Sequence, residues 1–229
     1  MRVLVFWSTG KDSALALHAL RTLGFKVVGL ITTVDSSSNL ITGHRVPVEL
    51  ARVQAEKLGL PLYEVELPED FPPIEVYEDV IVRELQRIKR ESGASVVAHG
   101  DIYIRDMIDY KRKLLEKVGM ESLYPLEGLS SLNVVEAALT LDVKALIVAA
   151  DPAKLGPILA HRLICSTLDM RMLKELPAAA DIAGERGEYH TFVTYMPGFR
   201  GPINVRVGGV RLEKWRLGWK LVCNVELAL

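Results

Sequence analysis

The chain is poor in cysteine. Among its 229 residues there are only two, Cys165 and Cys223, and they form no C-x-x-C pair. This scarcity argues against a disulfide framework, a cysteine-based zinc site and a redox pair. We therefore expect both cysteines to be small buried apolar residues.

The chain also lacks a long basic run, and its formal net charge is −1. A nucleic-acid partner is therefore not expected. The apolar stretch that begins the chain ends at Ser8, which makes it too short for a signal peptide or a membrane span. These absences predict a cytoplasmic protein with no membrane partner.

Apolar residues are abundant: they make up 49% of the chain, and the mean hydropathy is +0.20. Four apolar runs have the length of buried strands and alternate with segments of helical periodicity; they cover residues 3–7, 27–31, 62–67 and 94–98. This alternation predicts an α/β, Rossmann-like fold, in which helices cover both faces of a parallel sheet.

The pattern changes after Pro125. Helices are expected near 131–141 and 169–175 and a strand at 144–149, before a strand-rich region that covers 189–195, 203–207, 210–212 and 221–227. The pair Gly208-Gly209 predicts a hairpin turn. We divide the chain into a larger domain, 1–125, and a smaller α+β domain, 126–229. The C-terminal hairpin offers an edge to a second subunit, so a homodimer is one expectation.

The most informative segment is the polar loop Ser8-Thr9-Gly10-Lys11-Asp12-Ser13, which lies between an apolar strand and a run of helix formers. Such a junction aims backbone N–H groups and a helix dipole at one point, which suits a phosphate. The loop lacks the Gly-x-x-x-x-Gly-Lys-Ser/Thr pattern, because Val5 stands five residues before Gly10. The alternative is a capped strand–turn–helix junction without a ligand.

Polar residues also follow two other predicted strands. Thr32 comes after strand 27–31, and Gly100 and Asp101 come after strand 94–98. Ligands of open α/β sheets bind at the carboxyl ends of strands, near the point where the strand order reverses. These residues are therefore candidates for the same nucleotide site, with ordinary surface turns as the alternative.

A second constellation reads Gly-Glu-Arg-Gly-Glu-Tyr-His-Thr over residues 184–191. Its carboxylates, Glu185 and Glu188, are suited to hold a metal, to bind ammonium or to act as a general base. His190 is suited to donate to a phosphate or a carbonyl. The alternative is a solvated loop whose carboxylates face water.

The first loop resembles the Ser-Gly-Gly-x-Asp-Ser loop of PP-loop pyrophosphatases, which cleave ATP between its α- and β-phosphates, although Thr9 stands where that family usually has Gly. Together with the 184–191 motif it resembles the diphthine–ammonia ligase family, PP-loop proteins of the adenine nucleotide alpha hydrolase-like superfamily with a HUP-type fold. The stretches Gly100-Asp101-Ile102 and Tyr124-Pro125-Leu126 agree, and the resemblance covers about residues 1–200.

This resemblance implies that ATP, Mg²⁺ and ammonia convert diphthine on elongation factor 2 into diphthamide, AMP and pyrophosphate through an acyl-adenylate. Lys11 would offset charge on the pyrophosphate, and Asp12 would place Mg²⁺. The other residues of the ATP site would be Ser8, Thr9, Gly10, Ser13, Thr32, Gly100 and Asp101. The acceptor or ammonia site would consist of Glu185, Glu188 and Thr191, with His190 as a further candidate.

The sequence departs from the family pattern at Glu127, where many relatives have Trp after Pro-Leu. Two alternatives therefore stay open. One is a PP-loop enzyme that adenylates another acceptor such as tRNA, although such enzymes generally need cysteines or a basic RNA-binding surface. The other is an adenine-nucleotide sensor without turnover, because a shared fold does not set function.

Overall fold

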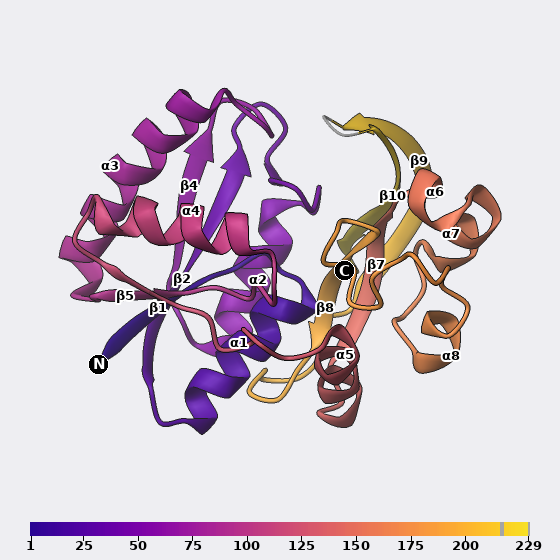
Figure 1. Cartoon of the computed structure of the whole chain (residues 1–229), viewed down its shortest axis with the longest axis horizontal. Coiled ribbons are helices and arrows are strands. Elements are labelled where there is room, and N and C mark those ends of the chain that lie inside the picture. Colours follow the sequence, from indigo (N-terminus) through magenta and orange to yellow (C-terminus); the bar gives the residue numbers. More distant parts are fainter. Residues whose placement is uncertain (216–217, 229) are drawn as a thin grey trace.

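The computed structural model describes residues 1–215 and 218–228, and its strands form two sheets that lie beside each other (Figure 1). Parallel strands of the first sheet follow the spatial order β4 (Leu62–Leu67), β2 (Lys26–Asp35), β1 (Arg2–Phe6), β5 (Val96–Ala98), β6 (Glu121–Leu123). The short β3 (Leu40–Ile41) pairs antiparallel with the end of β2. Along the sequence, β2 and β4 are added on one side of β1, and β5 and β6 are added on its other side. The strand order therefore reverses between β1 and β5, and the carboxyl ends of these two strands are the expected ligand position.

Helices cover both faces of this sheet: α1 (Lys11–Thr22) and α2 (Val48–Leu58) on one face, α3 (Ile74–Ser92) and α4 (Arg105–Glu116) on the other. Side chains of a strand alternate between faces, so Val3 and Val5 pack in one apolar cluster while Leu4 packs in the other. The predicted α/β, Rossmann-like fold with helices on both faces is confirmed.

The second sheet is antiparallel, with the order β8 (Tyr189–Tyr195), β7 (Lys144–Ala150), β10 (Gly218–Leu227), β9 (Val205–Trp215). Its helices are α5 (Ser131–Thr140), α6 (Pro152–Leu155), α7 (Pro157–Leu163) and α8 (Met170–Leu173). The predicted domain boundary after residue 125 stays a prediction, and its second part includes residues 216, 217 and 229, which lie outside the described residues.

Buried polar contacts join the two sheets next to the β1 end. The Val193 N–H on β8 donates to the Thr9 carbonyl over 2.9 Å. Gln54 on α2 donates to the carbonyls of both Thr9 (3.1 Å) and Val193 (2.7 Å), and its side-chain oxygen accepts from the Trp7 indole (2.7 Å). Strand β8 is thereby fixed against the loop that follows β1.

The prediction that both cysteines are unpaired apolar residues is wrong. Cys165 and Cys223 form a disulfide, with Cα atoms 5.4 Å apart despite a separation of 58 residues. Cys165 donates its backbone N–H to Ile147 on β7, and β7 pairs with β10, which carries Cys223. Sheet pairing brings the two sulfur atoms together. The disulfide could not be predicted from the spacing of the two cysteines in the sequence.

The prediction of a hairpin turn at Gly208-Gly209 is also wrong. Strand β9 continues through both glycines, and its pairing with β10 places Trp215 opposite Gly218. The register shifts next to Gly209, whose φ is +132°. The glycines therefore form a bulge within a strand. Like a hairpin turn, a bulge accommodates a glycine with positive φ.

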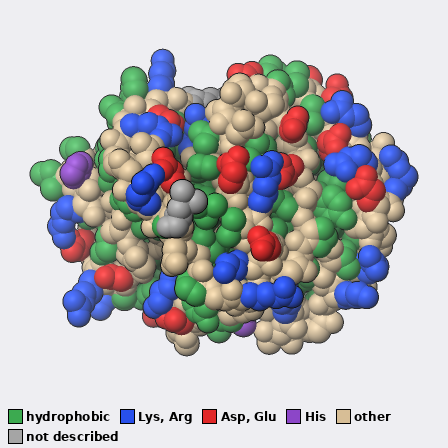
Figure 2. Space-filling view, turned by 180° about the vertical axis from the view of Figure 1, so that it is seen from behind, with side chains coloured by type: hydrophobic (Ala, Val, Ile, Leu, Met, Phe, Trp, Pro, Cys, Tyr) green, Lys and Arg blue, Asp and Glu red, His purple; other side chains and the backbone are tan. Residues whose placement is uncertain are grey.

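Two observations concern the predicted partners: the charges on one face of the molecule, and the length and apolar character of its helices. On the face turned away from the viewer in Figure 1, Lys and Arg side chains lie among Asp and Glu side chains (Figure 2). Over the ranges 1–215 and 218–228, no helix combines the length and the apolar character that a membrane crossing needs.

Candidate functional site

A pocket of about 220 Å³ lies where the carboxyl ends of β1 and β5 face the second sheet. Parts of three segments far apart in sequence line it, within residues 8–13, 99–101 and 183–191, together with Phe6, His44 and Lys111. Of the residues predicted from the sequence, the lining contains Ser8, Lys11, Asp12, Ser13, Gly100, Asp101, Glu185, His190 and Thr191.

The loop after β1 is shaped by its backbone. Thr9 is fully buried with φ +71°, a left-handed conformation that glycine adopts readily and a β-branched residue rarely does. This explains why a Gly is usual at that place in the motif. Thr9 does not line the pocket; its carbonyl anchors β8 and Gln54. Ser13 donates to the Gly10 carbonyl (2.9 Å), and Ser8 donates to Ser13 (3.3 Å).

Two predicted glycines permit close approach. A Cβ on Gly100 would lie 2.7 Å from the carbonyl carbon of Asp12 and 2.8 Å from the backbone nitrogen of Ser13. A Cβ on Gly10 would lie 3.0 Å from the Thr191 carbonyl oxygen. Gly100 thus lets the end of β5 touch the first turn of α1, and Gly10 lets that turn touch β8.

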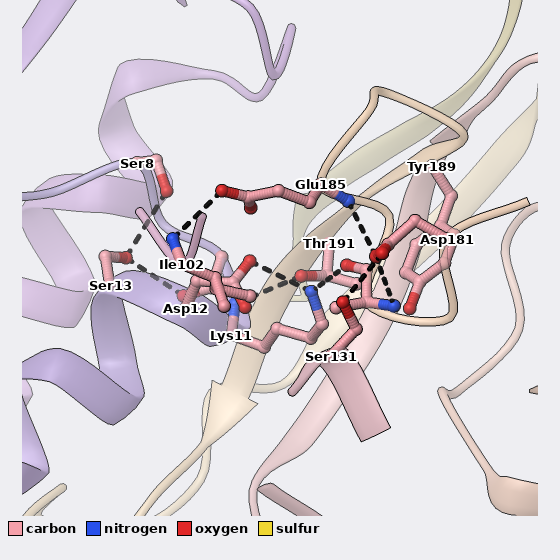
Figure 3. Close-up of polar contacts among 12 residues, drawn as sticks. Ser8, Lys11, Asp12, Ser13, Ile102, Ser131, Asp181, Glu185, Tyr189 and Thr191 are labelled. Carbon is pink, nitrogen blue, oxygen red and sulfur yellow. Dashed lines mark hydrogen bonds and ion pairs between the residues drawn. The ribbon is translucent and has the colours of Figure 1, made fainter. Parts of the chain in front are cut away.

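Lys11 connects the two predicted motifs. Its backbone N–H donates to Thr191 Oγ1 over 3.0 Å, and its ammonium donates to Asp12 (2.9 Å) and to the Ala183 carbonyl. The same ammonium lies 5.4 Å from the centre of the Tyr189 ring. Residues separated by 180 positions in the sequence are therefore in direct contact (Figure 3).

Asp12 fits a shared Mg²⁺ site. Its Oδ2 accepts from Lys11, while its Oδ1 is buried and has no partner among the described residues. Burial raises the pKa of Asp12, and although Lys11 lowers it, Asp101 raises it further. The described residues contain no group of three or more metal-ligating side chains. Because Mg²⁺ is commonly held by one or two carboxylates plus substrate phosphates, Asp12 Oδ1 fits that ion together with phosphate oxygens.

Asp101 lies at the same edge of the pocket but is already paired. Both of its carboxylate oxygens accept from Lys111 over 2.7 Å. The Lys111 ammonium therefore offsets the negative charge of Asp101.

The two glutamates of the second motif have opposite environments. Glu185 lines the pocket and accepts from the Ile102 N–H over 3.0 Å. Burial raises its pKa to about 7, and the nearby carboxylates of Asp12 and Asp101 add to that effect. Glu185 therefore has the pKa of a general base at neutral pH.

Glu188 lies outside the pocket lining and is 2% exposed. Its two oxygens accept from the backbone N–H groups of Asp181 (2.9 Å) and Arg186 (3.1 Å). Glu188 therefore links two backbone segments inside the loop, and the structure does not bring it to the candidate residues that line the pocket. Its predicted catalytic role stays a prediction.

His190 lies beside a second histidine, His44. Their ring centres are 4.8 Å apart, and the other neighbour of His190 is the Trp215 ring at 5.5 Å. Burial lowers the pKa of His44 to about 4 and takes the pKa of His190 well below its usual value. Both imidazoles are therefore neutral at pH 7. His44 Nδ1–H donates to the Thr191 carbonyl (3.3 Å), which leaves its other ring nitrogen as an acceptor.

Thr32 is not brought to the pocket. It is fully buried within β2, and its hydroxyl has no partner among the described residues. Its predicted part in nucleotide binding stays a prediction.

Sequence reasoning missed Asp181, which organises the second motif. Its carboxylate accepts from Tyr103 (2.8 Å), from Ser131 (2.6 Å) and from two backbone N–H groups, at Ala183 and Glu185. Burial favours its protonated form, but the hydrogen bonds from Ser131 and Tyr103 outweigh burial and hold the pKa of Asp181 below its usual value. No spacing pattern marked it, because its partners are spread over the chain.

His44 and His99 were also not among the predicted site residues, although His99 directly precedes Gly100, which was. Both line the pocket.

Comparisons with known proteins give one family match. A family model described as the diphthamide synthase N-terminal domain matches residues 1–123. A search of curated proteins found no match.

Two solved structures resemble the chain weakly. One is a predicted subunit of tRNA methyltransferase from Methanocaldococcus jannaschii, with 18% identity over 86% of this chain and 98% of that chain, at a TM-score of 0.44. The other is a pyruvate carboxylase from Rhizobium etli with acetyl coenzyme A, with 16% identity over 65% of this chain and 15% of that chain, at a TM-score of 0.33. At such TM-scores neither structure informs the function.

Proposed function

Because the chain belongs to the family of the diphthamide synthase N-terminal domain, a family of ATP-utilising PP-loop proteins, we propose that it is an AMP-forming ligase. The proposed reaction joins ammonia to the carboxylate of diphthine on elongation factor 2. Its products are diphthamide, AMP and pyrophosphate.

One observation carries the proposal. The phosphate-type loop 8–13 and the glutamate-bearing segment 183–191 line the same pocket, and Lys11 contacts Thr191 and Ala183 across it. A nucleotide sensor needs only the first of these segments. A ligase needs both, because the activated acyl group must form beside the group that receives the proton of ammonia.

In the first step the acceptor carboxylate attacks the α-phosphorus of ATP, and the bond to the β-phosphate oxygen breaks. Pyrophosphate leaves toward the first turn of α1, where backbone N–H groups lack intrahelical acceptors. The hydroxyls of Ser8 and Ser13 lie there and would turn from their bonds to Ser13 and to the Gly10 carbonyl to donate to the phosphates. The Lys11 ammonium offsets the charge that builds on the leaving group. Asp12 would hold Mg²⁺, which supplies further charge neutralisation when it is bound.

In the second step ammonia attacks the acyl carbon, and AMP leaves. The nitrogen must lose a proton as the amide forms. Glu185 is the group in the pocket whose pKa, at about 7, suits it to accept that proton at neutral pH. The neutral imidazoles of His44 and His190 also line the pocket, with their ring centres 4.8 Å apart.

The test is an incubation of purified protein with MgATP, ammonium and elongation factor 2 that carries diphthine. AMP and pyrophosphate should appear together, and AMP release should require both acceptor and ammonium. Formation of ADP would contradict the proposed cleavage between the α- and β-phosphates. AMP formation with tRNA and without elongation factor 2 would favour another acceptor, and binding without turnover would favour a sensor.

A further inference from the structure

His99 is a buried histidine for which the proposed reaction has no use so far. It follows β5 directly and is 4% exposed. Neither of its ring nitrogens has a hydrogen-bond partner within residues 1–215 and 218–228. A buried polar atom without a partner costs stability, so a native protein normally gives it one.

Its neighbours are aromatic. The His99 ring lies between Phe6, at 5.4 Å and an interplanar angle of 20°, and Tyr124, at 5.3 Å and 19°. The three rings stand at the ends of the neighbouring strands β1, β5 and β6, so their stack follows the strand order. A phenylalanine at position 99 would continue this stack without burying any polar atom. Stacking alone therefore gives no reason for an imidazole.

The ring forms part of a wall between two cavities. One is the 220 Å³ pocket described above. The other is a space of about 20 Å³, lined mainly by apolar side chains of α3 and α4, with room for about one water molecule. Only the larger cavity has room for a ligand, and Gly100 places this wall against the backbone of Asp12 and Ser13. A ligand bound at the first turn of α1 would therefore lie beside this wall, to which His99 belongs.

From this geometry we infer that His99 contacts the nucleotide, donating one ring N–H to an oxygen of its phosphate chain. The inference rests on the proposed function, because it assumes a phosphate ligand at residues 8–13. Phosphate oxygens only accept hydrogen bonds, so the imidazole must act as the donor.

The aromatic stack suits this role. Burial lowers the pKa of His99 to about 3, so the ring stays neutral and keeps one N–H and one lone pair. Lys11 supplies positive charge at the site, while His99 adds a directional contact from the carboxyl end of the neighbouring strand β5. This makes His99 a specificity residue for phosphate-bearing ligands.

The experiment compares the wild-type protein with His99→Phe, which keeps the stacked ring, and with His99→Gln, which restores a side-chain N–H. Calorimetry measures the binding of MgATP, Mg-pyrophosphate and adenosine. For His99→Phe we expect affinities for ATP and pyrophosphate about tenfold lower, because a hydrogen bond to a charged group is lost, and no change for adenosine. His99→Gln should recover part of the loss.

Thermal unfolding separates this role from a structural one. His99→Phe should melt at the wild-type temperature or above it, because it removes two buried polar atoms without partners. A variant that melts lower and binds pyrophosphate as tightly as the wild type would show that the imidazole is structural and would overturn the inference.

Nitrogen-15 NMR of the wild-type imidazole gives a readout that needs no variant. Addition of Mg-pyrophosphate should shift one His99 ring nitrogen and leave the ring neutral; an unchanged signal with bound pyrophosphate would overturn the inference alone. A wild-type protein that binds neither ATP nor pyrophosphate would instead overturn the proposed function, and the inference with it.

Discussion

The two loops that face each other across the pocket are built in different ways. The loop 8–13 is a junction between a buried strand and a buried helix. Close main-chain packing at Gly10 and against Gly100 holds it, together with hydrogen bonds to the uncharged side chains of Gln54, Ser13 and Thr191. The loop 181–191 is held by charged side chains that bond to its own backbone, through Asp181 and Glu188 from inside. Lysines hold it from outside: Lys154 donates to the Arg186 carbonyl and Lys220 to the Gly187 carbonyl.

The difference suggests a division of labour. A loop fixed by backbone packing presents N–H groups in one geometry, which suits a ligand that is the same in every turnover, such as a triphosphate. A loop fixed by titratable groups places carboxylates at defined pKa values, which suits proton transfer. Substitutions in the first loop should therefore affect nucleotide handling, and those in the second should affect either the amide-forming step or the stability of the loop.

The largest effect is expected for Lys11→Ala, which removes the ammonium that reaches both loops. Loss of a preorganised positive group at a site of developing charge lowers rates by roughly 10³-fold. AMP formation at saturating ATP should fall by about this factor. Lys57→Ala is the control, because Lys57 donates to the Arg200 carbonyl outside the pocket. Equal rates for Lys11→Ala and Lys57→Ala would contradict the assignment of Lys11.

Removal of the disulfide tests whether the second sheet can lose stability without a change in nucleotide binding at loop 8–13. Replacing Cys165 and Cys223 together by serine should lower the free energy of unfolding by about 3 kcal/mol, because the bond closes a long loop in the unfolded chain. Denaturant titrations with and without reductant measure the loss. Binding of MgATP by the folded variant should stay near the wild-type value. An equally large loss in the free energy of nucleotide binding would contradict the proposal that the two regions act separately.

Glu185→Gln sharpens the comparison within the second loop. The variant should form amide roughly 10²-fold more slowly, since it cannot accept a proton, while ATP–pyrophosphate exchange should continue. In the wild type kcat/KM should rise with pH through about 7, the pKa of Glu185, as the carboxylate form appears. The variant should lack this step. A step near pH 7 that survives the substitution would assign it to another group.

Stability should change with pH in the opposite direction. The pKa of Glu185 is higher in the folded protein, about 7, than its ordinary value of 4.5, so the folded state binds the extra proton between these values. The free energy of unfolding that Glu185 contributes therefore falls as pH rises from 4.5 to about 7. The difference in unfolding free energy between wild type and Glu185→Gln, measured across this range, shows the effect.

The smallest effect is expected for Glu188→Ala. The substitution leaves the N–H groups of Asp181 and Arg186 without an acceptor, which costs about 2 kcal/mol of unfolding free energy. Glu188→Gln keeps one acceptor oxygen and should lose about half as much. Denaturant titrations give both values. If Glu188→Ala lost amide formation with full stability, Glu188 would belong to the catalytic group after all.

Much of the first sheet could be predicted from the sequence. The predicted strand 62–67 matches β4 in its bounds, because its apolar residues alternate with glutamates. The short strands β3 and β6 and the short helices α6 and α7 were missed, since two to seven residues are too few to show a period. Gly208-Gly209 was misread because glycine is typical both of hairpin turns and of strand bulges, and only Gly209 adopts a positive φ.

By itself the sequence determined the α/β architecture, the phosphate-type loop at residues 8–13 and the family, because these depend on local periodicity and on contiguous motifs. Only the tertiary structure decided that Glu185 and His99 line the pocket while Glu188 does not, that Asp181 holds the second motif, and that Cys165 meets Cys223. The physical reason is that burial, carboxylate pKa values and sulfur pairing depend on atoms contributed by remote segments. Those segments come together only when β8 pairs with β7 and is fixed against the end of β1.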